Sequence, residues 1–278
     1  TYTVTYNANG GSGSMSTDNP KYGSNYVTRS NGFTPPVGHS FKGWNEDRNG
    51  NGVDWTGYIG KNWTWTYMNN VTLYAQWKAN AYTVTYNANG GDGSMSQDNP
   101  IYGENYVAKD CTFTRKGYTF AGWNEQKDGK GKSWIGYTGA NGTKWKWNYT
   151  YNITLYAQWT PNRYTVTYNA NGGSGTMSVD RDIAYGSNYV TKGNGFTAPN
   201  GHKFAGWNEK SDGTGISWTS YIGKNWTWTY TNNVTLYAQW EANKYTVKVD
   251  PNGGSFNVAD TSITKNSDGI ATFKTTYN

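Results

Sequence analysis

Histidine, the side chain used most often for acid–base catalysis, is rare in this chain. The only histidines are His39 and His202, and a closely similar stretch has Tyr118 at the matching place. An aromatic ring is therefore tolerated at this position, and we expect a structural role for it. A catalytic site needs a nucleophile, a base and an orienting group together, and we find no such set recurring along the chain.

One carboxylate recurs in a fixed context, directly after a Gly-Trp-Asn sequence. Its copies are Glu46, Glu125 and Glu209. Hydrolysis of a glycosidic bond needs two carboxylates at one site, and we identify no second recurrent acid beside this one. The sequence therefore predicts a protein without enzymatic activity.

Residues 47–54 have part of the spacing of a calcium-binding loop. Oxygen-bearing side chains at alternate positions around a glycine turn are the pattern of an EF-hand loop. The candidate ligands are Asp47, Asn49, Asn51 and Asp54. The acid that such a loop needs at its last position is replaced by Tyr58, and Lys130 in a matching stretch would repel a cation. We therefore favour a polar, glycine-rich hairpin loop over a metal site, and we expect no cofactor.

Aromatic residues give the strongest remaining signal for ligand binding. They make up 17% of the chain, whereas leucine occurs only at Leu73, Leu155 and Leu236. Because a small domain needs buried apolar area, Trp63, Trp65 and Trp77 are expected to fill a leucine-poor core. Exposed aromatic rings can instead mark binding sites, for example for sugar rings. The pairs that flank the Gly-rich loop are the better candidates for exposure: Trp55, Tyr58, Trp134, Tyr137, Trp218 and Tyr221.

Charge, cysteine content and hydropathy exclude several other classes of protein. The net charge of +6 is spread along the chain, without the basic cluster that a nucleic-acid-binding protein concentrates on one face. The single cysteine, Cys111, can form no internal disulfide bond and lacks the partners of a metal site. No apolar run reaches the roughly 18 residues of a membrane span, so we expect no membrane insertion. Thr1 starts directly in a strand-like pattern, without a secretory signal.

The chain is built from repeats, and these decide its architecture. The phrase VTLYAQW or a close variant ends each repeat, at residues 71–77, 153–159 and 234–240. A second phrase, YTVTYNANGG or a variant, opens at Tyr2, Tyr82, Tyr164 and Tyr245. We therefore predict a first repeat at 1–80, a second at 81–162, a third at 163–243, and a partial or divergent fourth at 244–278.

The pattern within a repeat predicts a mainly β fold with little helix. Residues 2–6 alternate large apolar side chains with threonine, which is the period of a half-buried strand. Asn-Gly and Gly-Gly pairs supply the positive φ angles that tight turns need. The linkers between repeats are only about four residues long, so we expect semi-rigid beads on a string, each in contact mainly with its neighbours.

Three phrases in a fixed order, YTVTYNANGG, GYTFAGW and TLYAQW, carry a resemblance to a known family. They resemble the internalin B-type repeat, also called the Listeria–Bacteroides repeat, over the first three segments. The resemblance implies a fold like the ubiquitin-like β-grasp, and tandem occurrence in secreted bacterial and archaeal surface proteins. Two parts of the chain depart from the family pattern: the Trp-rich residues 55–67, and the fourth segment, which lacks two of the phrases.

The sequence is compatible with three functions. The first is a structural and adhesive repeat region of a secreted protein at the cell surface or cell wall, where it meets glycans or proteins of a host or neighbouring cell. The second is a carbohydrate-binding array that gains avidity from linked weak sites. The third is a subunit of an extracellular filament, in which a strand from another copy of the chain completes an open sheet edge in the fourth segment.

Overall fold

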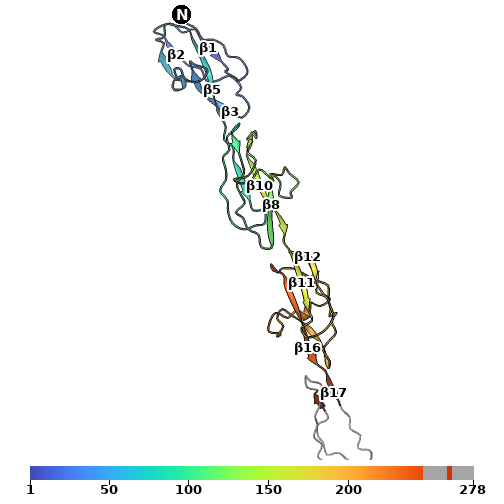
Figure 1. The fold of residues 1–278 in the computed structure, drawn as a ribbon. Helices are drawn as coiled ribbons and strands as arrows, with labels where there is room; N and C mark the ends of the chain where they lie inside the picture. Colours follow the sequence, from blue (N-terminus) through green and yellow to red (C-terminus); the bar gives the residue numbers. More distant parts are fainter. Residues whose placement is uncertain (247–261, 265–278) are drawn as a thin grey trace, which may run out of the picture. The chain divides into compact units, whose positions relative to one another are not determined.

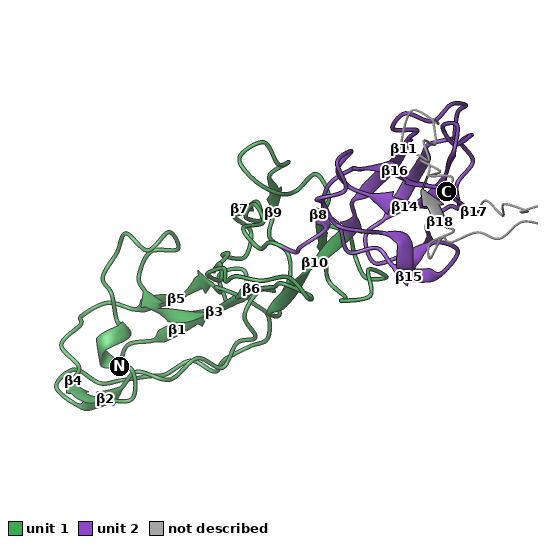
Figure 2. Ribbon diagram, turned by 90° about the horizontal axis from the view of Figure 1, so that it is seen from below, with its two compact units in different colours: residues 1–114, 120–159 green, residues 115–119, 160–278 purple. Residues whose placement is uncertain are grey.

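The computed structural model of the chain describes residues 1–246 and 262–264 (Figure 1). These residues divide into two compact units, which have different colours in Figure 2. Unit 1 comprises residues 1–114 and 120–159, and unit 2 comprises residues 115–119 and the described residues from 160 onward.

The described residues are almost entirely strands and loops, with two short 3-10 helices. The first repeat contains β1 (Val4–Asn7), β2 (Asn25–Val27), β3 (His39–Asn45), η1 (Thr56–Tyr58), β4 (Asn62–Thr64) and β5 (Val71–Ala79). The second contains β6 (Val84–Asn87), β7 (Asn105–Tyr106), β8 (Tyr118–Asn124), β9 (Trp145–Lys146) and β10 (Ile153–Pro161). The third contains β11 (Arg163–Asn169), β12 (Asp180–Ala184), β13 (Asn188–Val190), β14 (His202–Asn208), η2 (Thr219–Tyr221), β15 (Asn225–Thr227) and β16 (Val234–Ala242). The predicted fold class, mainly β in tandem repeats, is confirmed.

The last long strand of each repeat is the centre of its sheet. β5 lies between β1, to which it is parallel, and β3, to which it is antiparallel. β10 has the same place between β6 and β8, and β16 between β11 and β14, with β12 added beyond β11. A two-stranded ribbon accompanies each sheet: β2 with β4, β7 with β9, and β13 with β15. The central strands are the recurring phrase, whose apolar positions Val71, Leu73 and Ala75 are buried because side chains alternate between faces.

A close contact between backbone and side chain joins the sheet to the segment that follows it. The register between β3 and β5 shifts between Phe41 and Gly43, which is a β-bulge. A Cβ atom at Gly43 would lie 1.7 Å from Oγ1 of Thr56, so only glycine fits there. Trp55 donates its backbone N–H to the carbonyl of Trp44 at 2.9 Å. Together these contacts hold η1 and its neighbouring aromatic rings against the sheet.

Each repeat has its own core of tryptophans around one leucine. In the first repeat Trp44, Trp55, Trp65 and Leu73 are at most 1% exposed, and the second and third repeats bury the same positions in separate clusters. The prediction that aromatic rings replace leucine in the core is confirmed. Trp63 and Trp77, which we also expected inside, are only half-buried and pack against the cluster.

The fourth segment is described only in β17 (Lys244–Thr246) and β18 (Ser262–Thr264), which pair in antiparallel fashion. Residues 247–261 and 265–278 lie outside the described residues, so the coupling of copies into a filament through this segment stays a prediction. The likeness to a β-grasp, the exact repeat boundaries and the arrangement as beads on a string also stay predictions. In the part of the chain that the structure describes, no helix has the length and apolar character needed to cross a membrane.

Candidate functional site

A groove lined by aromatic rings lies on the third repeat, beside η2 and β15. Its rings are Trp218, Tyr221, Trp226 and Tyr230, and we call this site, with its counterparts in the other repeats, the aromatic groove. The groove of the third repeat has a volume of about 580 Å³ and opens to solvent, and Ile216 also lines it. Its remaining lining residues are polar, Thr227, Thr229, Thr231 and Asn232, so the groove combines aromatic rings with hydrogen-bonding groups, as ligand sites do.

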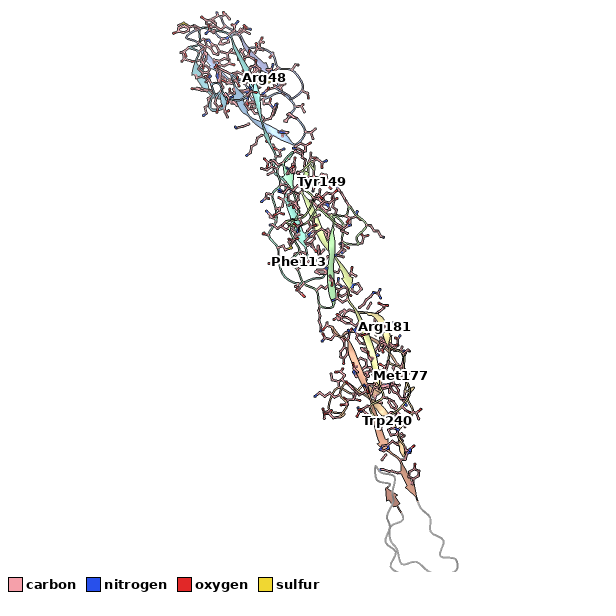
Figure 3. All side chains as sticks on the ribbon, viewed as in Figure 1. Arg48, Phe113, Tyr149, Met177, Arg181 and Trp240 are labelled. Carbon is pink, nitrogen blue, oxygen red and sulfur yellow. The ribbon has the colours of Figure 1, made fainter. Side chains whose placement is uncertain are left out.

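The rings of the aromatic groove recur in all three repeats, and two of their pairings keep the same geometry. An edge-to-face tryptophan pair forms one part, with ring centroids 5.2, 5.3 and 5.2 Å apart: Trp55 with Trp63, Trp134 with Trp145, and Trp218 with Trp226. A tyrosine lies edge-to-face with the second tryptophan of each pair, at 6.2, 5.8 and 6.2 Å: Tyr67, Tyr149 (labelled in Figure 3) and Tyr230. The ring cluster is therefore a property of the repeat, and the open groove beside it is described in the third repeat.

The six aromatic residues predicted to be exposed divide by residue type. The tyrosines are exposed by 46, 38 and 41%: Tyr58, Tyr137 and Tyr221. The tryptophans are each only 1% exposed, so the expectation of their exposure is wrong: Trp55, Trp134 and Trp218. Each of these indoles packs into the core of its repeat and donates its Nε1–H to the recurrent glutamate, at 2.8, 3.0 and 2.9 Å. Their part in ligand binding stays a prediction.

Sequence reasoning missed the half-buried rings that face the groove, such as Trp226 and Tyr230. The alternation of Trp and Thr in residues 61–67 placed Trp63 and Trp65 on one face and predicted both for the core. Strand β4 ends at Thr64, but the alternation in burial continues past it, with Trp63, Trp65 and Tyr67 turned toward the core and Thr64 and Thr66 exposed. The two rings differ only in how far they are covered: Trp65 is fully buried, whereas Trp63 keeps part of its ring at the surface.

A glutamate lies beside the rings of each aromatic groove. In the third repeat Glu209 accepts the hydrogen bond from Nε1 of Trp218. Burial, together with the negative charge of Glu209, raises the pKa of Tyr230 to about 12. Burial and the charge of Glu46 likewise raise the pKa of Tyr67 in the first repeat. The electrostatic environment of the groove therefore disfavours further negative charge and suits a cation.

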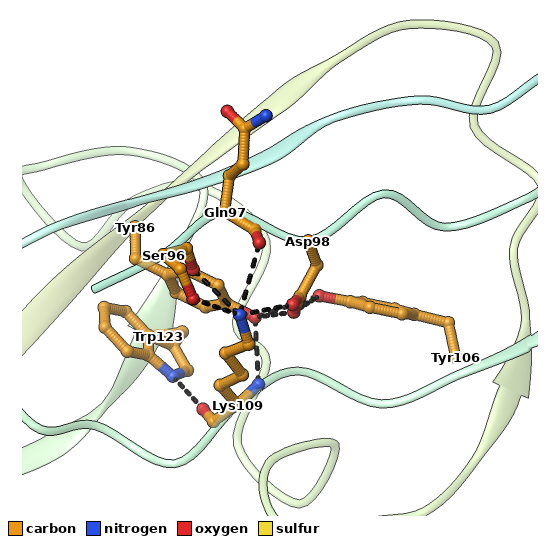
Figure 4. Close-up of polar contacts among 7 residues, drawn as sticks. All are labelled: Tyr86, Ser96, Gln97, Asp98, Tyr106, Lys109 and Trp123. Carbon is orange, nitrogen blue, oxygen red and sulfur yellow. Dashed lines mark hydrogen bonds and ion pairs between the residues drawn. The ribbon is translucent and has the colours of Figure 1, made fainter.

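A second recurrent constellation joins two tyrosines, an aspartate and a cationic side chain. In the second repeat the hydroxyl groups of Tyr86 and Tyr106 donate to Oδ2 of Asp98 at 2.6 and 2.9 Å (Figure 4). Nζ of Lys109 lies 2.7 Å from Oδ1 of the same carboxylate, and the Lys109 backbone N–H donates to the Tyr86 hydroxyl at 2.9 Å. Because Tyr86 comes from β6 and Tyr106 from β7, this network ties the sheet to the two-stranded ribbon.

The aspartate of this network overturns one sequence-based statement. Asp18 and Asp180 occupy the matching places in the other repeats, so a second recurrent acid does exist. Its context varies between Asp-Asn-Pro and Asp-Arg-Asp, which concealed the recurrence. In the first repeat Asp18 binds two tyrosine hydroxyls and the guanidinium of Arg29, while Glu46 accepts from an indole instead. Both acids therefore have structural partners of their own.

The candidate calcium loop is a hairpin loop whose carboxylates bind backbone amides. Oδ1 of Asp47 accepts the N–H of Asn49 at 2.7 Å and lies 3.5 Å from the N–H of Asn51. Oδ1 of Asp54 accepts the N–H of Thr56 at 2.8 Å, and the side chain and backbone of Thr56 lower the pKa of Asp54. Among the described residues no cluster of three or more His, Cys, Asp or Glu side chains could hold a metal ion. The two carboxylates of this hairpin loop are thus bonded to backbone amides, and a calcium site there stays a prediction.

The two histidines, one in the first repeat and one in the third, each contact a backbone carbonyl. Nδ1 of His39 lies 2.8 Å from the carbonyl oxygen of Val37, and Nδ1 of His202 lies 2.9 Å from that of Asn200. The ring of His39 also lies edge-to-face with Tyr102, with centroids 5.7 Å apart. These contacts are those of a residue that shapes a turn and packs against an aromatic ring.

Comparison with known proteins gives a family match over most of the chain. The sequence model of the Listeria-Bacteroides repeat domain matches residues 2–76, 82–158 and 164–239. These matches contain the buried core of each repeat and most of its sheet.

Three curated relatives, from two bacteria, are similar in sequence to this chain. Evansella cellulosilytica has one relative named a Gly-rich membrane protein, which is 33% identical over 84% of this chain and 26% of its own length. A second, named a membrane protein, is 32% identical over 90% of this chain and 33% of its own length. Internalin H of Listeria monocytogenes is 31% identical over 62% of this chain and 27% of its own length. The chain thus spans about a quarter to a third of the length of these relatives.

Proposed function

The chain belongs to the Listeria–Bacteroides repeat family, and on that premise we propose that it is a non-enzymatic structural and adhesive repeat region of a secreted protein at the cell surface or cell wall. The names of the relatives, membrane proteins and an internalin, support a place at the cell envelope. The recurrent acids support a non-enzymatic role, because each is bound to structural partners. Its partners are glycans or proteins on a host or neighbouring cell.

The observation that carries this proposal is the recurrence of the aromatic ring cluster in three repeats with separate cores, with an open groove beside it in the third. Half-buried aromatic rings beside exposed tyrosines are the usual composition of binding surfaces. Several weak sites on one chain gain avidity when they bind one surface together. An adhesive region needs this combination, whereas an enzyme needs one assembled catalytic site.

Retention of coated beads on cells tests the adhesive role. The groove variants Tyr221→Ala and Trp226→Ala change the third aromatic groove, and Tyr22→Ala removes a ring that is 57% exposed outside it. We expect the unchanged chain and Tyr22→Ala to hold beads equally, and both groove variants to release them under lower shear. Equal retention of all four proteins would refute the role of the groove in adhesion.

A carbohydrate-binding array is the second candidate, because the open groove presents aromatic rings to solvent. Aromatic faces are suited to stacking on the apolar faces of sugar rings. Titration of tryptophan emission with cell-wall polysaccharides tests it, with Trp226→Phe as the variant that keeps a ring but alters the site. Emission that is insensitive to every polysaccharide would count against this candidate.

A further inference from the structure

In the second repeat the aromatic groove already contains a ligand-like group, the side chain of Lys132. Its Nζ lies 5.0 Å from the ring centroid of Tyr149, 5.3 Å from that of Trp145 and 6.0 Å from that of Trp134. The same Nζ donates a hydrogen bond to the Tyr149 hydroxyl at 2.9 Å. That hydroxyl in turn donates to Oε1 of Glu125. The ammonium group is therefore held by three aromatic rings and a short relay to a carboxylate.

The other two repeats have an aliphatic residue at the position of Lys132. Val53 and Ile216 take this place in the first and third repeats, and they are 49 and 55% exposed. The rings that hold Lys132 are nevertheless present there. In the third repeat Trp226 and Tyr230 meet at 76°, against 74° for the corresponding pair of the second repeat. The third groove thus keeps this edge-to-face pair and lacks the lysine, while Tyr230 lies closer to Trp218, at 5.1 Å and 45°, than Tyr149 lies to Trp134, at 6.3 Å and 26°.

Exposure of the ring that closes the groove agrees with this difference. Tyr149, under Lys132, is only 9% exposed, whereas Tyr230 is half-buried. Glu209 lies beside the third groove as Glu125 lies beside the second, each as acceptor for its indole N–H. A cation over aromatic faces is attracted by their quadrupole, and more so where the site is partly desolvated and a carboxylate is near.

We propose that the aromatic groove of the third repeat binds the side-chain ammonium group of a lysine on a partner protein, as the groove of the second repeat binds Lys132. A lysine is the favoured occupant because the observed occupant is one, and its ammonium can donate to the Tyr230 hydroxyl while it lies over the rings. The first repeat likewise has an aliphatic residue, Val53, at the position of Lys132. This inference deepens the proposed adhesive function, on which it rests, by naming the ligand class.

The binding of a lysine side chain to the third groove can be followed through the fluorine resonance of Trp226. The full chain is labelled with 5-fluorotryptophan, and the resonance of Trp226 is identified by its loss in Trp226→Phe. The probe is Nα-acetyl-lysine methylamide, and Nα-acetyl-norleucine methylamide is the same molecule without the amine. We expect the lysine probe to shift the Trp226 resonance in a saturable way at millimolar concentration, and the norleucine probe to bind at least about tenfold more weakly.

Two variants provide matched controls. In Ile216→Lys the introduced side chain fills the third groove, so the shift of Trp226 by the probe should be lost. In Lys132→Ile the second groove opens, so the resonance of Trp145, assigned by Trp145→Phe, should become sensitive to the probe. The inference is overturned if the two probes act alike, if Ile216→Lys responds as the unchanged chain does, or if Trp226 responds to polysaccharides alone. The last result would leave the adhesive function standing. Equal bead retention by the unchanged chain and the groove variants would instead refute the role of the groove in adhesion.

Discussion

The hydroxyl oxygens of Tyr6 and Tyr26 lie 2.7 Å apart, and each lies within 3.0 Å of one carboxylate oxygen of Asp18. The Tyr6 hydroxyl also accepts the backbone N–H of Arg29 at 3.2 Å. Tyr6 belongs to β1 and Tyr26 to β2, so a buried polar network connects the sheet with the two-stranded ribbon. Buried networks of this kind stabilise a fold only when every member has its partners.

Tyr26→Phe should therefore destabilise the first repeat by about 1–2 kcal/mol, because the Tyr6 hydroxyl and Asp18 each lose a buried hydrogen-bond partner. Hydrogen exchange of the amides in β1 and β5 measures this cost within the repeat. Tyr22→Phe, at a ring 57% exposed, is the control and should leave exchange unchanged. Identical protection in the two variants would show that the network contributes nothing to stability.

Alkaline pH should unfold the repeats through the same network. Burial raises the pKa of Tyr6 to about 12, and burial raises the pKa of Tyr168 in the third repeat to about 12 as well. An unfolded tyrosine ionises near pH 10, so above this pH the unfolded chain binds fewer protons than the folded chain. The free energy of unfolding should be constant from pH 7 to about 9 and then fall by up to about 1.4 kcal/mol per pH unit for each such tyrosine.

Denaturant unfolding followed from pH 7 to 12 checks this dependence. Tyr6→Phe serves as the control, since removal of one ionisable network hydroxyl should make the decline less steep above pH 10. A free energy of unfolding that stays constant to pH 12, or falls already at pH 8, would contradict the assignment.

The strands could be predicted from sequence more fully than the site. Alternation in residues 2–6 and in the VTLYAQW phrase located β1 and β5, because one face of each is buried and the period of two is preserved. The parallel pairing of Val4 with Val71 could not be read from any local pattern. It joins residues at opposite ends of a repeat, and only the closed core of the repeat specifies it.

Unit 1 includes contacts between the first and second repeats. One of them is the close packing of the Tyr102 ring against Gly38, where no side chain stands in the way. A Cβ atom at Gly38 would lie 2.2 Å from Cγ of Tyr102. The Tyr102 backbone N–H donates to the carbonyl of Asn80, and the Asn80 N–H donates to that of Gly38. The linker residue Asn80 is thus bonded on both sides, to one repeat and to the next.

Gly38→Ala should break this contact, because the Tyr102 ring must move and its backbone bond to Asn80 weakens. We expect the Tyr102 amide to exchange at least about tenfold faster, which corresponds to about 1.4 kcal/mol. Gly23→Ala is the matched control: its φ of +75° is close to the +73° of Gly38, but a Cβ there meets no atom within 4 Å. Backbone strain is then common to both, and equal exchange of Tyr102 in the two variants would disprove the steric role of Gly38.

Only part of the aromatic groove could be predicted from the sequence. Composition predicted many rings in a leucine-poor core, and Trp44 and Trp65 confirm it. Alternation places Trp63 and Trp65 on the same face, and it does not show that Trp63 is covered less completely than Trp65. The occupation of the second groove by Lys132 was equally invisible, because a charged residue in a loop is usually solvated.

Matched tryptophans in the first and third repeats should respond differently to the same substitution. Trp65 and Trp228 are both fully buried, but Nε1 of Trp228 donates to the carbonyl of Tyr230 at 2.9 Å, whereas Nε1 of Trp65 has no hydrogen-bond partner among the described residues. Trp→Phe leaves a similar cavity at both sites, yet Trp228→Phe also removes a buried hydrogen bond, while Trp65→Phe removes an unpaired donor. We expect Trp228→Phe to lower the free energy of unfolding of its repeat by about 1–2 kcal/mol more than Trp65→Phe does. Hydrogen exchange of the amides in β16 and β5 measures the two costs. Equal costs would show that the two indoles are bonded alike in solution.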